Sequence, residues 1–97
     1  MKTLICSSRI KTFFPELCLD YYLIKEKSRE GIVYGIQITQ HTPEGEQKES
    51  SRVHSMFTQR EKAEDLCRLL GFHQVTPSSL QEIAEDWILS EDSRNVF

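Results

Sequence analysis

The chain has 97 residues, a formal net charge of −3 and a mean hydropathy of −0.46, which leaves room for one hydrophobic core and therefore one domain. An isoelectric point of 5.6 opposes nucleic-acid binding, because that function needs a basic surface to neutralise phosphates. No apolar run is long enough for a membrane span, and the short apolar cluster after Met1 and Lys2 does not make a secretory signal.

The first part of the chain tends to alternate apolar and polar side chains, which is typical of antiparallel strands. Residues 1–15 predict at most an edge strand, because their alternation is weak and Pro15 closes the segment. Residues 17–26 are rich in aromatic and branched side chains, and they predict a strand that pairs with the clearest strand, residues 31–41. The polar segment 27–31 between them predicts a hairpin loop.

A turn follows at Pro43 and Gly45, and residues 47–57 predict a third, more polar strand. One face of this strand carries Val53, Ser55 and Phe57. Residues 17–57 therefore predict a meander of three strands, or of four when the first segment is included.

Helical spacing replaces alternation from Thr58 onward. Thr58 and Glu61 have the spacing of a capping box, which predicts that the first helix begins there. We expect Gly71 to stop this helix in a left-handed conformation and Phe72 to pack back on its last turn. The apolar stripe of the helix consists of Ala63, Leu66, Cys67 and Leu70, widened by Leu69.

A second helix begins with Thr76 as its cap and Pro77 in its first turn, where the missing N–H of proline has little effect. Its stripe consists of Leu80, Ile83, Ala84, Trp87 and Ile88. We expect the two helices to span residues 58–89 and residues 90–97 to fray. The predicted fold is one α+β domain over residues 1–97: a three- to four-stranded antiparallel β-meander followed by two amphipathic helices packed on one face of the sheet.

The cysteines and histidines do not form a recognisable site. The three cysteines cannot all pair within one chain and none are at C-x-x-C spacing, so we expect free thiols in a reducing cytoplasm. Cys67 lies in an apolar helical stripe and Cys18 next to Asp20, which indicates core packing for both rather than nucleophilic catalysis. Because His41, His54 and His73 fall in separate elements, we expect no metal site and no cofactor.

Acidic residues are concentrated late in the chain, since residues 1–57 carry a charge of +1 and residues 58–97 carry −4. Two pairs of carboxylates lie one helical turn apart, namely Glu61 with Asp65 and Glu82 with Asp86. Such pairs can share a proton or bind a cation, but acidic residues on helix exteriors usually form a solvated face. No phosphate-binding loop or catalytic motif is present, so we expect no catalytic residues.

Tyr21 and Tyr22 are adjacent in a predicted strand and must point to opposite faces of the sheet. One of them is expected on the face that the helices leave open, close to Val33 of the next strand, whereas Tyr34 is expected in the core. Tyr21, Tyr22 and Val33 are therefore the candidate residues of a surface that docks a protein partner or a second copy of the chain.

Four segments form a combined pattern: Leu19–Ile24, Tyr34–Ile36, the capped helix with Leu66 and Leu69–Leu70, and Val75–Leu80 with Glu85–Trp87. Over residues 17–90 this pattern resembles a family of short bacterial proteins of unknown function. The resemblance implies a small cytoplasmic bacterial protein and carries over no catalytic or binding residues. Residues 1–15 contain no features that match the family.

We expect a non-enzymatic protein-interaction or regulatory module, whose partner is another protein or itself as a homodimer. The alternative is a small enzyme, which needs a pocket that joins His54 or His73 to the carboxylates of the helices. Nucleic-acid binding ranks third, and no membrane partner is expected.

Overall fold

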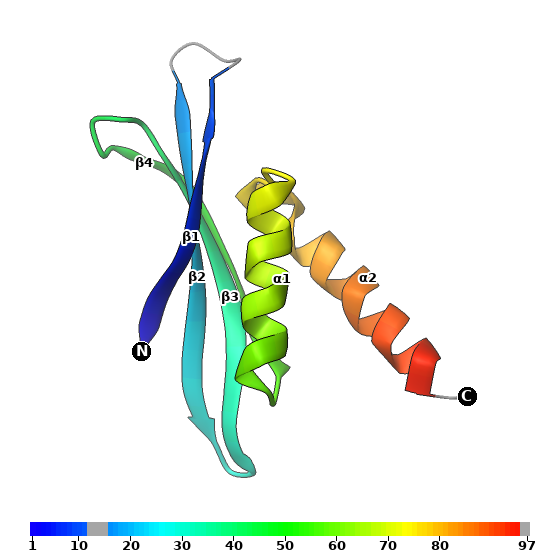
Figure 1. Ribbon diagram of the computed structural model, residues 1–97. Coiled ribbons are helices and arrows are strands. Elements are labelled where there is room, and N and C mark those ends of the chain that lie inside the picture. Colours follow the sequence, from blue (N-terminus) through cyan, green and yellow to red (C-terminus); the bar gives the residue numbers. More distant parts are fainter. Residues whose placement is uncertain (12–15, 96–97) are drawn as a thin grey trace.

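A computed structural model describes the backbone of residues 1–11 and 16–95, and the side chains of these ranges as far as Trp87. Four antiparallel strands form one sheet in the order β1-β2-β3-β4, and both helices lie on the same face of it (Figure 1). This arrangement confirms the predicted α+β meander with two helices. The elements are β1 (Lys2–Ile10), β2 (Leu17–Ser28), β3 (Gly31–His41), β4 (Gln47–Phe57), α1 (Arg60–Phe72) and α2 (Pro77–Asn95).

Strand β1 lies at one edge of the sheet, as the weak pattern of the first residues predicted. It pairs with β2 from Lys2 opposite Ile24 to Ile10 opposite Leu17, with a bulge at Ile5. The predicted closure at Pro15 lies outside the described residues. The bulge shifts the alternation of the strand by one residue, and this shift is why the sequence pattern is weak there.

The hairpin between β2 and β3 is tighter than predicted. Both strands extend into the polar segment, so that Ser28 pairs with Gly31 and only two residues form the turn. Gly31 has a φ of 127°, a conformation that glycine adopts without steric cost. The Ser28 hydroxyl donates to the Gly31 carbonyl at 2.9 Å and closes the turn.

Strand β4 carries an irregularity close to its end. Val53 lies opposite Ile36 and Phe57 opposite Tyr34, so the intervening part of β4 is longer than the part of β3 that it faces. Ser55 occupies the bulge with a φ of 52° and is exposed. The prediction that Ser55 shares one face of the strand with Val53 and Phe57 is therefore wrong, because the bulge interrupts the alternation.

The core lies between the sheet and the two helices. The largest side chains that are fully buried come from the two central strands and from both helices. They confirm the predicted apolar stripes except at Leu69, which is 39% exposed and does not widen the stripe of the first helix. In the second helix Ile83 and Trp87 are only partly buried, and the side chain of Ile88 lies outside the described residues. The fully buried set includes Leu19, Tyr21, Leu23, Ile36, Ile38, Leu66, Leu70 and Leu80.

Helix α1 begins later than the predicted capping box. Its N-cap is Gln59, in an extended conformation and without a side-chain capping hydrogen bond, so Thr58 does not cap the helix. The reason is Phe57, whose buried side chain keeps the chain in β4 up to that residue. The two residues after it are then needed to turn the chain toward the helix.

Helix α1 also ends differently from the prediction. Gly71 is buried inside the helix, and the left-handed residue is Gln74, with a φ of 52°. The N–H of Gln74 donates to the Gly71 carbonyl at 3.2 Å, and the N–H of Val75 donates to the Leu70 carbonyl at 3.0 Å. These two bonds form a Schellman motif with glutamine where glycine is usual. Phe72 does not pack back on the helix, because its side chain is 82% exposed.

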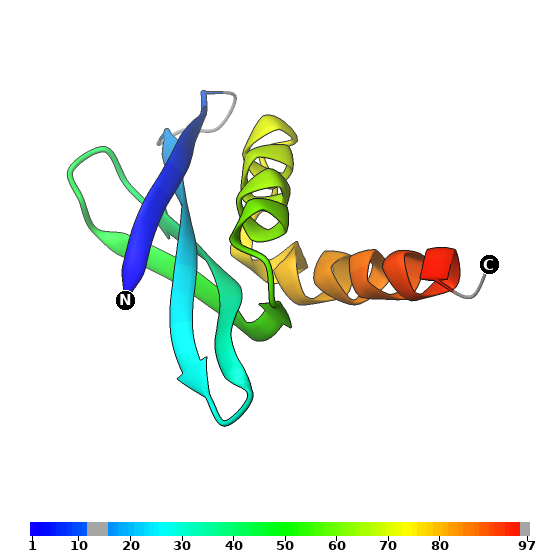
Figure 2. The same ribbon diagram turned by 60° about the horizontal axis from the view of Figure 1, so that its bottom comes forward.

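Helix α2 begins at Pro77, directly after Thr76, as predicted. It continues to Asn95, and residues 96–97 lie outside the described range, so the fraying expected from Ser90 stays a prediction. The C-terminal end of α2 extends away from the sheet (Figure 2). None of the helices in the described part of the chain is long and apolar enough to span a membrane.

Candidate functional site

The face of the sheet opposite the helices is the candidate interaction surface, and we call it the open face. In the described residues no helix covers this face (Figure 1). Because side chains alternate along each strand, the register assigns every second residue of the sheet to it. The open face includes Lys2, Leu4, Asp20, Tyr22, Gln37, His41 and Arg52.

The two adjacent tyrosines have different roles. Tyr21 is fully buried under α1, and its hydroxyl donates to the Val75 carbonyl at 2.9 Å. Burial raises the pKa of the Tyr21 hydroxyl, so this group stays neutral. The structure therefore places Tyr21 in the core and not on the open face, which corrects its inclusion among the candidate surface residues.

Tyr22 and Val33 do lie on the open face, and both are partly buried. The Lys2 ammonium lies 4.4 Å from the centre of the Tyr22 ring, where a cation–π contact holds the ring in place. Leu4 lies opposite Tyr22 in the register and is 52% exposed. Leu4 and Tyr22 thus form an apolar spot within a mostly polar face.

A serine, an aspartate and a histidine also meet on the open face. The Ser7 hydroxyl donates to Oδ1 of Asp20 at 2.7 Å, and Nε2 of His41 lies 2.9 Å from Oδ2 of the same carboxylate. The other ring nitrogen, Nδ1, lies 2.8 Å from the Thr42 carbonyl. The carboxylate stands between the hydroxyl and the imidazole, so the imidazole does not contact the hydroxyl and the order is not that of a Ser-His-Asp triad.

The centre of the open face is held by amide and guanidinium groups. Arg52 donates through Nη2 to Oε1 of Gln37 at 2.7 Å, and Nε2 of Gln37 donates to the Ser50 hydroxyl at 3.0 Å. Nearby, Nδ1 of His54 lies 2.7 Å from a carboxylate oxygen of Glu26. Arg52, Gln37 and Ser50 are bonded between the neighbouring strands β3 and β4, whereas the contact of His54 with Glu26 reaches from β4 across β3 to β2. These side chains therefore hold one another in place.

Two cysteines lie between the sheet and α1, as core packing predicted for Cys67. The Cys6 thiol lies 3.5 Å from the Cys67 carbonyl, and the Cys67 thiol lies 3.7 Å from the Tyr22 carbonyl. All three cysteines are free. Burial raises the pKa of the Cys67 thiol to about 12 and also raises the pKa of Cys6. Neither thiol is therefore activated for nucleophilic attack.

We expect the Cys67 thiol to resist alkylation by iodoacetamide at pH 8 in the folded protein and to react fully in denaturant. Because its pKa rises from 9.0 to about 12 on folding, its contribution to stability is complete below pH 9. That contribution is lost as the pH rises from 9 to 12, where the unfolded thiol ionises first. Mass spectrometry of alkylated protein measures the first effect, and denaturant unfolding of the wild type and Cys67→Ala across this pH range measures the second.

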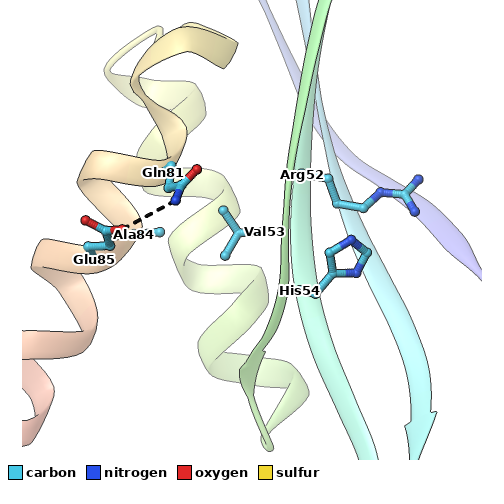
Figure 3. Close-up of a pocket in the computed structure, with 6 residues that line it drawn as sticks. All are labelled: Arg52, Val53, His54, Gln81, Ala84 and Glu85. Atoms are coloured by element: carbon cyan, nitrogen blue, oxygen red, sulfur yellow. Dashed lines mark hydrogen bonds between the residues drawn. The ribbon is translucent and has the colours of Figure 1, made fainter.

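The alternative function predicted from the sequence, a small enzyme, requires a histidine and a helix carboxylate in one pocket. A groove of about 250 Å³ does lie between β4 and α2, and both His54 and Glu85 line it. The His54 ring, however, points to the open face, on the side of β4 away from Glu85 (Figure 3). His73 lies at the end of α1, where its ring contacts the edge of the Phe72 ring. The imidazoles of His54 and His73 therefore do not meet the carboxylates of the helices in one pocket.

The predicted carboxylate pairs do not form a site either. Asp65 and Glu82 are exposed on the helices, as are their partners one turn away. Within the residues that the structure describes, no three His, Cys, Asp or Glu side chains are grouped so that they could hold a metal ion. The groove was not predicted from the sequence, because its walls come from two distant segments, β4 and α2, and no sequence pattern links these segments.

The comparisons with known proteins give one match. A family model described as a family of unknown function (DUF6514) matches residues 1–90. This confirms the resemblance seen in the sequence and extends it to the first strand. No curated protein and no solved structure matches the chain.

Proposed function

The chain belongs to this family of unknown function, and from its geometry we propose that it is a non-enzymatic protein-interaction module whose open face docks an acidic surface of another protein. The observation that carries the proposal is the apolar spot of Leu4 and Tyr22, set among polar side chains that their neighbours hold in place. Interfaces combine such a tyrosine anchor with a polar surround. The free thiols support a cytoplasmic location.

Charge on the open face supports an acidic partner. Asp20 and Glu26 are each bonded to a histidine of the same face. Lys2 and Arg52, by contrast, have an aromatic ring and an amide as their partners, and no carboxylate of the described residues pairs with them. A second copy that presented the same face would bring like charges together, which disfavours a face-to-face homodimer.

The test uses a photo-crosslinking amino acid in place of Tyr22 in living cells, with Glu61 on the exposed face of α1 as the control position. We expect a specific crosslinked product from position 22 and none from position 61, and mass spectrometry should place the crosslink next to acidic residues of the partner. Differently tagged copies reveal whether the product is a second copy of the chain. Equal products from both positions, a crosslink to nucleic acid, or a product made of two copies would contradict the proposal.

A further inference from the structure

The groove between β4 and α2 is separate from the open face. It is lined by the backbone of β4 and by the first half of α2 (Figure 3). The side chains of Arg52 and His54 point to the other side of the strand, so these two residues contribute their main chain to the groove. Val53, Gln81, Ala84 and Glu85 contribute side chains.

Strand β4 is the outermost strand, and part of its main chain faces the groove. The Val53 carbonyl points toward β3, because a Cβ built on Gly35 would overlap its oxygen. The N–H of His54 is trans to this carbonyl and therefore points away from β3. Arg52 lies in the regular part of the strand before the bulge, where alternation turns its peptide groups away from β3 as well. Within the described part of the chain, no other strand lies beyond β4 to pair with these groups. An edge of this kind is a template for an added strand.

The helix that flanks this edge is strongly acidic. Helix α2 contains five acidic residues and one basic residue, Arg94. At the groove itself the Glu85 carboxylate is exposed and accepts a hydrogen bond of 3.4 Å from the Gln81 amide. Below it, Val53 and Ala84 form an apolar floor. The combination suits a lysine or arginine side chain, whose aliphatic stem packs on the floor while its charge reaches the carboxylate.

We propose that this groove binds an extended basic segment of another protein, which adds to the sheet as a fifth strand beside β4. The main chain of the segment pairs with the outward-facing groups of Arg52 and His54, and a lysine or arginine of the segment lies over Glu85. Main-chain pairing supplies affinity, and the acidic helix selects the charge of the segment.

The chain's own free edge strand does not supply this segment. Suppose that β1 of a second copy paired with β4 as the next antiparallel strand. Only the edge of β1 that does not pair with β2 is available for this, so the second sheet would continue the first with its open face on the same side. Lys2 and Arg9 would remain on the open face, next to Arg52 and on the far side of the sheet from Glu85. The charges would then repel, so a partner of different sequence is required.

The probe is a fluorescein-labelled peptide of about eight residues in which threonine alternates with lysine, so that all lysines share one face of a strand. Binding is measured by fluorescence anisotropy with the full chain, and a peptide with glutamate in place of lysine is the charge control. The protein variants are Glu85→Lys in the groove and Glu82→Lys, an equal charge change on the same helix outside the groove. Circular dichroism confirms that both variants fold.

We expect the lysine peptide to bind, the glutamate peptide to bind more weakly, and Glu85→Lys to lose at least about tenfold in affinity while Glu82→Lys loses less than about twofold. Hydrogen exchange at the Arg52 and His54 amides should slow on binding. Absence of binding at about 1 mM peptide, equal losses in both variants, or unchanged exchange at these amides would overturn the proposal. Tyr22→Ala should leave peptide binding intact, and Glu85→Lys should leave crosslinking from position 22 intact, so the two proposals can fail separately.

Discussion

Replacement of Gly35 by alanine is expected to lower the free energy of unfolding by about 3 kcal/mol, at the upper end of the usual cost of overpacking. Gly35 lies opposite the bulge of β4, and a Cβ there would overlap the Val53 carbonyl oxygen and press on the backbone of His54. Both contacts are with main-chain atoms, so the overlap can be removed only if the backbone of β4 shifts. The bulge forces this close approach, and only glycine accommodates it.

Thermal unfolding followed by circular dichroism measures the effect, with an expected fall in Tm of about 15 °C for a domain of this size. The matched control is Gly71→Ala, where the added Cβ would lie 2.7 Å from the Cys6 sulfur. A thiol can rotate away, and alanine is favoured over glycine in a helix by about 1 kcal/mol, so we expect a net change within about 1 kcal/mol. Equal destabilisation by both variants would show that the backbone contact at Gly35 is not decisive.

The second large effect is expected at Tyr21. Tyr21→Ala should lower the free energy of unfolding by about 3–5 kcal/mol, because it removes a fully buried aromatic ring from the centre of the core. Tyr22→Ala, one residue along the same strand, should cost about 1 kcal/mol or less, since that ring is partly exposed and contacts a lysine. Urea unfolding monitored through the single tryptophan compares the two variants directly.

A third variant separates the ring of Tyr21 from its hydroxyl. Tyr21→Phe keeps the packing but removes the hydrogen bond to the Val75 carbonyl, and we expect a loss of about 1 kcal/mol. If Tyr22→Ala destabilised the fold as much as Tyr21→Ala, the assignment of the two tyrosines to opposite faces would be wrong.

The sequence predicts the architecture well where one face of an element is buried. The alternation of Ile36 and Ile38 with polar neighbours identified β3, and the spacing of Leu66 and Leu70 identified α1, because burial on one side leaves a periodic pattern. The same periodicity placed Tyr21 and Tyr22 on opposite faces. It did not show which of them was buried, since that depends on which side the helices pack.

The sequence does not predict the places where two segments approach closely. Gly71 has the position of a helix stop, but it lies inside α1, where the lack of a side chain lets the helix approach Cys6 and Tyr21. The Ser8 hydroxyl also donates to the Gly71 carbonyl, at 2.5 Å.

The left-handed residue after α1 is Gln74, a residue type without the usual preference for that conformation. Its side-chain amide donates to the Arg9 carbonyl at 3.1 Å. Contacts between distant segments decide both cases, and no local pattern records them.

For the candidate site, too, the sequence predicts the features that depend on one strand but not the contacts between strands. The prediction that one of the two adjacent tyrosines lies on the open face close to Val33 agrees with the structure, because alternation within a strand is a local property. The bonding of Asp20 to His41 and of Glu26 to His54 depends on strand register, which the sequence leaves undetermined.

The meander, in which every strand pairs only with its neighbours in sequence, also has a consequence for folding kinetics. The β2–β3 hairpin closes around a two-residue turn, so it needs little loop entropy and is expected to form within microseconds, before the other pairings. The contact between Ser8 and Gly71 joins residues 63 positions apart and is expected to form last. Substitutions in the hairpin should therefore slow folding, whereas substitutions where α1 meets β1 should mainly accelerate unfolding.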